Sequence, residues 1–302
     1  MSISQNPIGQ FLLKSIMSVP IGRDRLRFYS TIDWQQESDR FRKSDLIYPL
    51  YYSGANFHGI QGGYLNSVAA ITYDVVTAFA SPPSETWIRQ QLISAINQKP
   101  NRILDLGCGT GSATLMLKQA FPKAEVMGLD LSPYMLIVAD YKAQEAGLDI
   151  QWQHGLAEDT GLEEDSFDLV TASFLLHETP PKISQLILQE CFRLVQPGGQ
   201  TIILDGNQKR LRRADWLIKL FQEPYSKVYA AGSVDDWMRT ARFEAVQTDY
   251  VEWIDQITCG INTKLQSNVE SSPLLSLSEI RSNKKAKLSI RKKRLKLIHG
   301  MN

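Results

Sequence analysis

The chain has few cysteines, few histidines and no long apolar run. Its three cysteines, Cys108, Cys191 and Cys259, are far apart and form no CxxC or Cys/His zinc pattern. This spacing excludes a disulfide framework, predicts no metal site and suits a reducing compartment. No apolar run reaches the roughly 18 residues of a membrane span. A net charge of +1 over 302 residues gives no bulk affinity for nucleic acid. These absences favour a cytoplasmic globular protein.

The charges are unevenly distributed along the chain. Residues 261–302 hold ten Lys and Arg against two Glu, a net charge of +8, so residues 1–260 carry −7. The basic segment has no persistent apolar face, and we expect it to be disordered. It is either simply solvated or a contact for an anionic membrane or RNA. At the other end, residues 11–19 are either an ordinary packed segment or an amphipathic helix on a membrane.

Three glycines follow a short apolar run at 102–106, and they organise the rest of the chain. The run reads as a buried parallel strand, and residues 112–120 read as the helix after it. Gly107, Gly109 and Gly111 therefore occupy a strand-to-helix turn, where the backbone must turn sharply and a ligand must approach closely. Their G-x-G-x-G spacing differs from the G-x-G-x-x-G of dinucleotide-binding proteins, because position 112 is serine.

Strands and helices alternate regularly after this turn, which predicts an α/β doubly wound sheet. We expect further strands at 125–131, 150–154, 167–175 and 200–205, with a closing pair at 243–246 and 249–254. Helices are expected to 146 after Ser132-Pro133, over 182–195, over most of 212–229 and over 234–241. The expected domains are an N-terminal helical cap at 1–99, the α/β domain at 100–258 and the basic tail at 259–302.

Four blocks in the expected order resemble the class I S-adenosylmethionine (SAM) methyltransferases. They are the glycine turn with Asp105 before it, Asp130-Leu131-Ser132 at the end of the second strand, Ser166-Phe167-Asp168-Leu169-Val170 at the start of the fourth, and Pro197-Gly198-Gly199 before the fifth. The blocks are similar to those of the small-molecule branch that includes the ubiquinone and menaquinone biosynthesis methyltransferases. This resemblance covers roughly residues 100–255. It implies a Rossmann-like sheet of about seven strands in the order 3-2-1-4-5-7-6, with the last strand antiparallel.

The resemblance also implies SAM as the cofactor and a set of residues that bind it. Asp130 is the acid at the tip of the second strand, which accepts both ribose hydroxyls. The family usually has Asp or Asn where this chain has Leu156, so either Glu158 or the backbone at Ala157 would meet the adenine. The whole implied cofactor set is Asp105, Gly107, Cys108, Gly109, Gly111, Asp130, Leu131, Ser132, Met135, Ala157, Glu158 and Ser173.

The acceptor side is predicted from residue chemistry. His177 follows the fourth strand, where cofactor and acceptor should meet, and is either a general base or a packing residue. Residues 48–64 combine five aromatics with four glycines and read either as a lid or as a surface loop plugged into the domain. Tyr52, His58 and Tyr64 are its candidate acceptor-binding side chains.

We therefore expect methyl transfer to oxygen or carbon of a small, partly apolar acceptor. A segment with Asn/Asp-Pro-Pro-aromatic at the end of the fourth strand is typical of nucleic-acid methylation, and here that place reads Ala172-Ser173-Phe174. Two other functions remain open. One is a regulatory or scaffold protein that binds SAM without catalysis, and the other is an NAD-linked oxidoreductase, which the glycine spacing disfavours.

Overall fold

The structure is a computed structural model that describes residues 29–58, 60, 62–80, 84–214, 216, 218, 223–252 and 254–264. The described residues, all of which precede Leu265, form one compact unit. Residues 11–19, for which two readings were left open, and most of the basic tail lie outside the described residues. No helix within the described ranges combines the length and the apolar character that a bilayer crossing requires.

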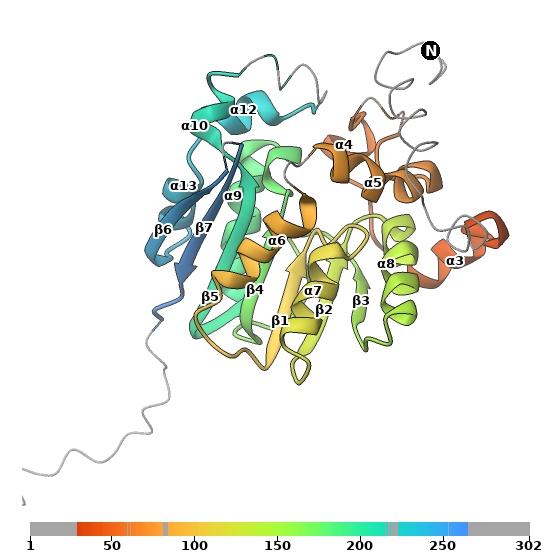
Figure 1. The fold of residues 1–302 in the computed structure, drawn as a ribbon, viewed down its shortest axis with the longest axis horizontal. Helices are drawn as coiled ribbons and strands as arrows, with labels where there is room; N and C mark the ends of the chain where they lie inside the picture. Colours follow the sequence, from red (N-terminus) through yellow and green to blue (C-terminus); the bar gives the residue numbers. More distant parts are fainter. Residues whose placement is uncertain are drawn as a thin grey trace, which may run out of the picture. The chain divides into compact units, whose positions relative to one another are not determined.

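A seven-stranded sheet forms the centre of the molecule, in the order β3-β2-β1-β4-β5-β7-β6 (Figure 1). Its strands are β1 (Arg102–Leu106), β2 (Glu125–Asp130), β3 (Gln151–His154), β4 (Phe167–Ser173), β5 (Val195–Gly206), β6 (Glu244–Val251) and β7 (Asp255–Ile261). Strands β1 to β5 pair in parallel, and β7 is antiparallel to both of its neighbours. The expected strand order and the antiparallel last strand are confirmed.

Helices cover both faces of the sheet, which is why its central strands are mostly apolar. Helices α6 (Glu85–Ser94) and α7 (Ser112–Ala120) lie over one face, and α9 (Pro181–Leu194) and α13 (Val234–Thr240) lie over the other. On β1, Ile103 faces the first layer and Leu104 and Leu106 face the second. Alternate side chains point to opposite faces of a strand, so the apolar residues of β1 contribute to two cores at once.

The N-terminal part packs beside the carboxyl ends of the strands. It contains α3 (Trp34–Phe41), α4 (Leu50–Ser53) and α5 (Ser67–Ala80), and α3 and α5 contact α8 (Pro133–Glu145). A third apolar cluster joins it to α8, with Phe57, Tyr64, Met135 and Val138 at its centre. Helix α8 begins as expected, since the Ser132 side chain accepts a hydrogen bond from the Met135 amide and Pro133 takes the first helical position.

The predicted closing strands are wrong in their bounds. We expected one strand to end at Val246 and a second to cover 249–254, whereas β6 runs through both segments to Val251 and β7 follows at 255–261. A bulge at Ala245, with φ of 49°, shifts the register and breaks the alternation. Gln247 and Thr248 read as a turn, yet they belong to an edge strand that tolerates polar residues. Cys259, assigned to the tail, lies inside β7.

One further expectation needs correction. Strand β5 already begins at Val195, so the Pro197-Gly198-Gly199 segment is the first part of this strand and not a turn before it. Around the helix expected over most of 212–229, the structure describes the short α10 (Gln208–Leu211) and, after Pro224, α12 (Ser226–Ala231). Several residues between them lie outside the described ones.

Candidate active site

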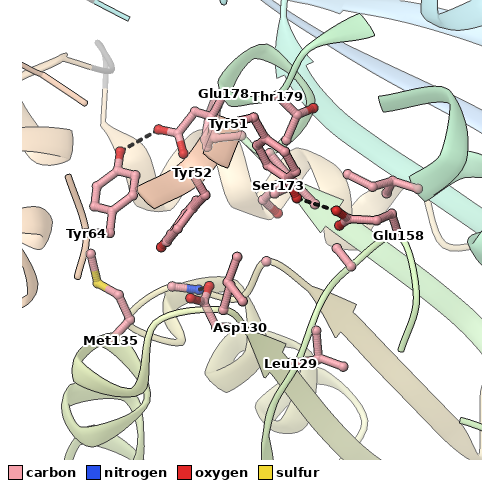
Figure 2. A pocket seen from close by; sticks show the side chains of 18 of the residues that line it. Tyr51, Tyr52, Tyr64, Leu129, Asp130, Met135, Glu158, Ser173, Glu178 and Thr179 are labelled. Atoms are coloured by element: carbon pink, nitrogen blue, oxygen red, sulfur yellow. Dashed lines mark hydrogen bonds between the residues drawn. The ribbon is translucent and has the colours of Figure 1, made fainter. Parts of the chain in front are cut away.

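A cavity lies at the carboxyl ends of β1, β2 and β4, beneath residues of the cap. This is the edge of an open α/β sheet at which ligands bind. Figure 2 shows Asp130 and Leu129 on the sheet side of the cavity, with Tyr51, Tyr52 and Tyr64 of the cap opposite them. The lining residues are Tyr51, Tyr52, Tyr64, Tyr73, Gly107, Gly109, Leu129, Asp130, Leu131, Met135, Gly155, Ala157, Glu158, Ser173, Phe174, Leu175, Glu178, Thr179 and Ile187.

The glycine turn forms part of the sheet-side wall. Gly109 has φ of +53°, and a Cβ built on it meets only Tyr73 Cε1, at 3.8 Å. A ligand can therefore approach this backbone with no side chain in the way. Gly111 has φ of +75° and serves packing instead, because a Cβ there would lie 2.8 Å from Trp152 and 3.0 Å from Ala139. The three-glycine motif thus combines one position open to a ligand with others fixed by the protein's own side chains.

Asp130 joins the glycine turn to the start of α8. Its carboxylate accepts hydrogen bonds from the Gly109 amide at 2.7 Å and the Ser132 amide at 2.8 Å. The Ser132 hydroxyl in turn donates to the Tyr64 carbonyl at 2.7 Å. Burial raises the pKa of Asp130 to about 6, and the two amide hydrogen bonds oppose that rise. A carboxylate has lone pairs for more than two donors, so it retains acceptor capacity toward the cavity.

Four members of the predicted cofactor set lie behind the cavity wall. Asp105 is buried beneath the turn, where it accepts hydrogen bonds from Thr114 at 2.6 Å and Thr171 at 2.8 Å. Burial raises its pKa. Cys108, Gly111 and Ser132 are also absent from the lining. These four residues shape the turn and the helix start, whereas the other eight members of the set line the cavity.

Two hydrogen bonds between tyrosines and glutamates connect the cap to the domain across the cavity. The Tyr51 hydroxyl donates to Glu158, in the loop after β3, and the Tyr64 hydroxyl donates to Glu178, after β4 (Figure 2). Burial raises the pKa of both tyrosines, with the neighbouring carboxylates adding to the effect. The tyrosines therefore stay neutral donors, and each bond fixes one carboxylate at the cavity edge.

His177 lies outside the cavity lining, between two carboxylates. Its Nδ1 is 2.5 Å from Asp205 Oδ1, and its Nε2 is 3.4 Å from Glu223 Oε1. Burial alone would lower the pKa of His177, but Glu223 and Asp205 outweigh it and raise the pKa well above the usual value. An imidazolium has no lone pair to accept a proton. This geometry argues against the general-base role predicted for His177 and favours the packing alternative.

Of the three residues predicted to bind the acceptor, two line the cavity and one does not. Tyr52 and Tyr64 line the cavity, whereas His58 lies behind Glu178, with its Nε2 3.5 Å from Glu178 Oε1. Sequence reasoning missed Tyr51, Tyr73 and Glu178. Tyr51 and Glu178 directly adjoin residues that the sequence had singled out, but Tyr73 belongs to an amphipathic helix, α5, with no local signal of a site. Within the described ranges, no cluster of His, Cys, Asp or Glu is arranged to hold a metal ion.

Comparisons with known proteins agree with this geometry. A family profile described as a methyltransferase domain matches residues 103–199. The chain is 34% identical over 140 residues to a demethylmenaquinone methyltransferase of Thermus thermophilus, a match that covers 46% of this chain and 63% of that protein. A protein of the same name from Bacillus velezensis is 33% identical over 165 residues, covering 52% of this chain and 70% of that protein.

The match to the first of these relatives thus covers less than two thirds of its length. Among solved structures, a putative SAM-dependent methyltransferase of Methanococcus maripaludis superposes with a TM-score of 0.53 at 16% identity, covering 67% of this chain and 96% of that one. At this identity the likeness concerns the fold alone.

Proposed function

The chain belongs to the class I SAM-dependent methyltransferases, and on that premise we propose that it transfers a methyl group to oxygen or carbon of a small, partly apolar acceptor. The observation that carries the proposal is the single cavity wall that holds both the open glycine turn and the Asp130 carboxylate. The cap closes the opposite side with aromatic side chains. This arrangement suits a cofactor on the sheet side and an acceptor beneath the cap.

The residues present fit SAM. The backbone at Gly109 is open toward the cavity, and the buried Asp130 carboxylate keeps acceptor capacity for the two ribose hydroxyls. Met135 and Leu131 add apolar surface beside Asp130. Glu158 and the backbone of Ala157 lie on the β3 side, where we infer that the adenine binds. When bound, SAM supplies a methyl group already activated by the positive charge on sulfur.

The chain's own residues then have three tasks. The glycine turn and Asp130 would hold the cofactor, and Ser173 at the end of β4 lines the same cavity. The tyrosines of the cap would exclude water and position the acceptor. Such positioning and desolvation account for most of the rate in a reaction whose group is already activated.

The cavity lining also limits the acceptor class. None of the described lining residues is Lys, Arg or His, while three are carboxylates: Asp130, Glu158 and Glu178. An anionic acceptor would be repelled there, and flat apolar rings would pack against Tyr52, Tyr73 and Phe174. We therefore favour a neutral, ring-containing acceptor. The name of the two relatives described above, demethylmenaquinone methyltransferase, refers to an acceptor of this chemical class.

A transfer assay tests the proposed function. Purified protein is incubated with [methyl-14C]SAM and a panel of quinols, phenols and lipid-like hydroxyl compounds, with matched carboxylic acids as anionic controls. We expect label to enter neutral ring compounds and not the acids. Binding of SAM without transfer to any member of the panel would instead support the non-catalytic alternative.

We further infer a cytoplasmic location with peripheral membrane contact. All three cysteines are unpaired, which suits a reducing compartment. The basic tail carries the charge that an anionic lipid surface attracts, and a partly apolar acceptor is itself concentrated in membranes.

A further inference from the structure

Glu178 stands out among the three cavity carboxylates because its role follows from none of the sequence motifs. It ends the short 3-10 helix Leu176–Glu178, directly after β4, and its side chain is only 14% exposed. Asp130 accepts a hydrogen bond from the Gly109 amide of the glycine turn. Glu158 lies in the loop after β3 and accepts one from Tyr51. Glu178 is therefore the carboxylate on the acceptor side of the cavity, near Ser173.

The contacts of Glu178 hold one oxygen and leave the other available. The Tyr64 hydroxyl donates to Oε1, and His58 Nε2 lies 3.5 Å from the same atom. Within the part of the chain that the structure describes, both recorded polar contacts fall on Oε1. A carboxylate oxygen accepts hydrogen bonds readily, so Oε2 can receive a donor from a molecule in the cavity.

A buried row of alternating carboxylates and imidazoles lies behind Glu178. His58 Nδ1 is 3.9 Å from Glu223 Oε1, Glu223 Oε1 is 3.4 Å from His177 Nε2, and His177 Nδ1 is 2.5 Å from Asp205. Burial lowers the pKa of His58, but its contact with Glu178 and the charge of Glu223 outweigh this and raise it. Glu178 stands at the cavity end of this row, with His58 Nε2 3.5 Å from its Oε1.

We propose that Glu178 is the acceptor-binding carboxylate and catalytic base, and that it takes a neutral aromatic hydroxyl. This inference rests on the proposed function and names the group that recognises the acceptor. The hydroxyl donates to Oε2, while its ring packs among Tyr52, Tyr64 and Phe174. His58 is a positioning residue that acts through Glu178.

The proposed step combines removal of the acceptor proton with transfer of the methyl group. Glu178 Oε2 takes the proton from the acceptor oxygen as the O–H bond breaks. The acceptor's electron pair forms the new bond to the methyl carbon, either at oxygen or at a ring carbon conjugated with it. The electrons of the sulfur–methyl bond remain on sulfur, which leaves S-adenosylhomocysteine (SAH) neutral at sulfur. In ring methylation, the displaced ring proton then restores the aromatic hydroxyl.

Binding to SAH-loaded protein tests this proposal without knowledge of the natural acceptor. The probes are 2-naphthol, its methyl ether, and 1-nitro-2-naphthol at a pH where its hydroxyl is ionised. Wild-type protein should bind 2-naphthol about tenfold more tightly than either other probe. The ether has no hydroxyl to donate to Glu178, and the naphtholate is an anion that the carboxylate repels. Glu178→Gln should lose about tenfold for 2-naphthol, keep its affinity for the ether, and gain affinity for the naphtholate.

The matched control is Glu125→Gln, which alters an exposed carboxylate at the start of β2 and should behave as wild type. Equal loss for 2-naphthol and its ether in Glu178→Gln would overturn the proposal, and so would affinity within twofold of wild type. If Glu178→Gln fails to fold, the affinities of wild-type protein for the three probes test the proposal. Affinity for the ether or the naphtholate equal to that for 2-naphthol would overturn it. A wild-type protein that fails to bind SAH would contradict the proposed function itself.

Discussion

Asp130 has to serve the fold and the ligand with one carboxylate. Its hydrogen bonds to the Gly109 and Ser132 amides hold the glycine turn against the start of α8. Burial makes the charged form costly and raises the pKa to about 6. Asp130 is therefore ionised at neutral pH but takes up a proton in mildly acidic solution. The affinity for SAM should depend on pH in that range.

We predict that SAM affinity weakens as the pH falls through about 6. Protonation converts one carboxylate oxygen into a donor, which cannot accept from a ribose hydroxyl. In the ligand-free protein the sign is opposite: the raised pKa means that the folded state binds the proton more tightly, so the contribution of Asp130 to the unfolding free energy rises as the pH falls. Titration calorimetry between pH 5 and pH 8 measures the first effect.

Asp130→Asn is the control for this pH dependence. It should bind SAM roughly tenfold to a hundredfold more weakly, the effect of losing charge-assisted hydrogen bonds, with no change of affinity around pH 6. A wild-type affinity that stays constant over the whole range would show that Asp130 does not contact the ligand.

His177 offers a second prediction at this scale. His177→Ala leaves Asp205 and Glu223 buried without their shared cation, which typically costs about 3–5 kcal/mol of unfolding free energy. Urea unfolding should detect this loss, while the affinity for SAM changes little. Normal stability together with a large loss of turnover would instead restore the general-base role.

At the scale of elements, two glycines of the same turn have different roles: Gly109 leaves room for the ligand, and Gly111 is required for packing. Gly109→Val places a branched side chain at the cavity wall, at φ of +53°, and should abolish SAM binding while the fold persists. Gly111→Val drives its Cβ into Trp152 and Ala139, and should lower the unfolding temperature strongly. Calorimetry and thermal unfolding of both variants make the comparison. SAM binding of normal affinity by Gly109→Val would contradict our assignment of the turn.

Sequence reasoning succeeded where an element has a strong local pattern. The apolar run of β1, the alternation of strands and helices, and the Ser132-Pro133 helix start all follow from short-range rules. It failed at β6 and β7, because a bulge at Ala245 and an exposed edge strand conceal the period of two.

The site likewise contains residues that a local motif predicts and residues that only the fold brings together. Gly109 and Asp130 were predicted because a motif fixes their positions, and they line the cavity. Glu178, Tyr51 and Tyr73 come from three segments, and only the folded chain brings them together. The imidazolium state of His177 depends on Glu223 and Asp205, 46 and 28 residues away, so no local pattern could reveal it.

At the scale of the whole molecule, the cap and the sheet form the cavity together, while the basic tail lies outside the described residues. We predict that a chain ending at Lys264 binds SAM with unchanged affinity. It should lose retention on vesicles containing phosphatidylserine, because the removed segment carries most of the basic excess. Co-sedimentation with anionic and neutral vesicles measures this, and equal retention of the long and short chains would favour a tail that is simply solvated.

The central claim concerns which ligand the glycine turn and Asp130 hold, and isothermal titration of the purified protein with SAM, SAH and NAD tests it most directly. We predict micromolar binding of SAM and SAH and no binding of NAD, since the glycine spacing suits a ligand without a pyrophosphate. Binding of NAD, or no binding of SAM and SAH, would contradict the account.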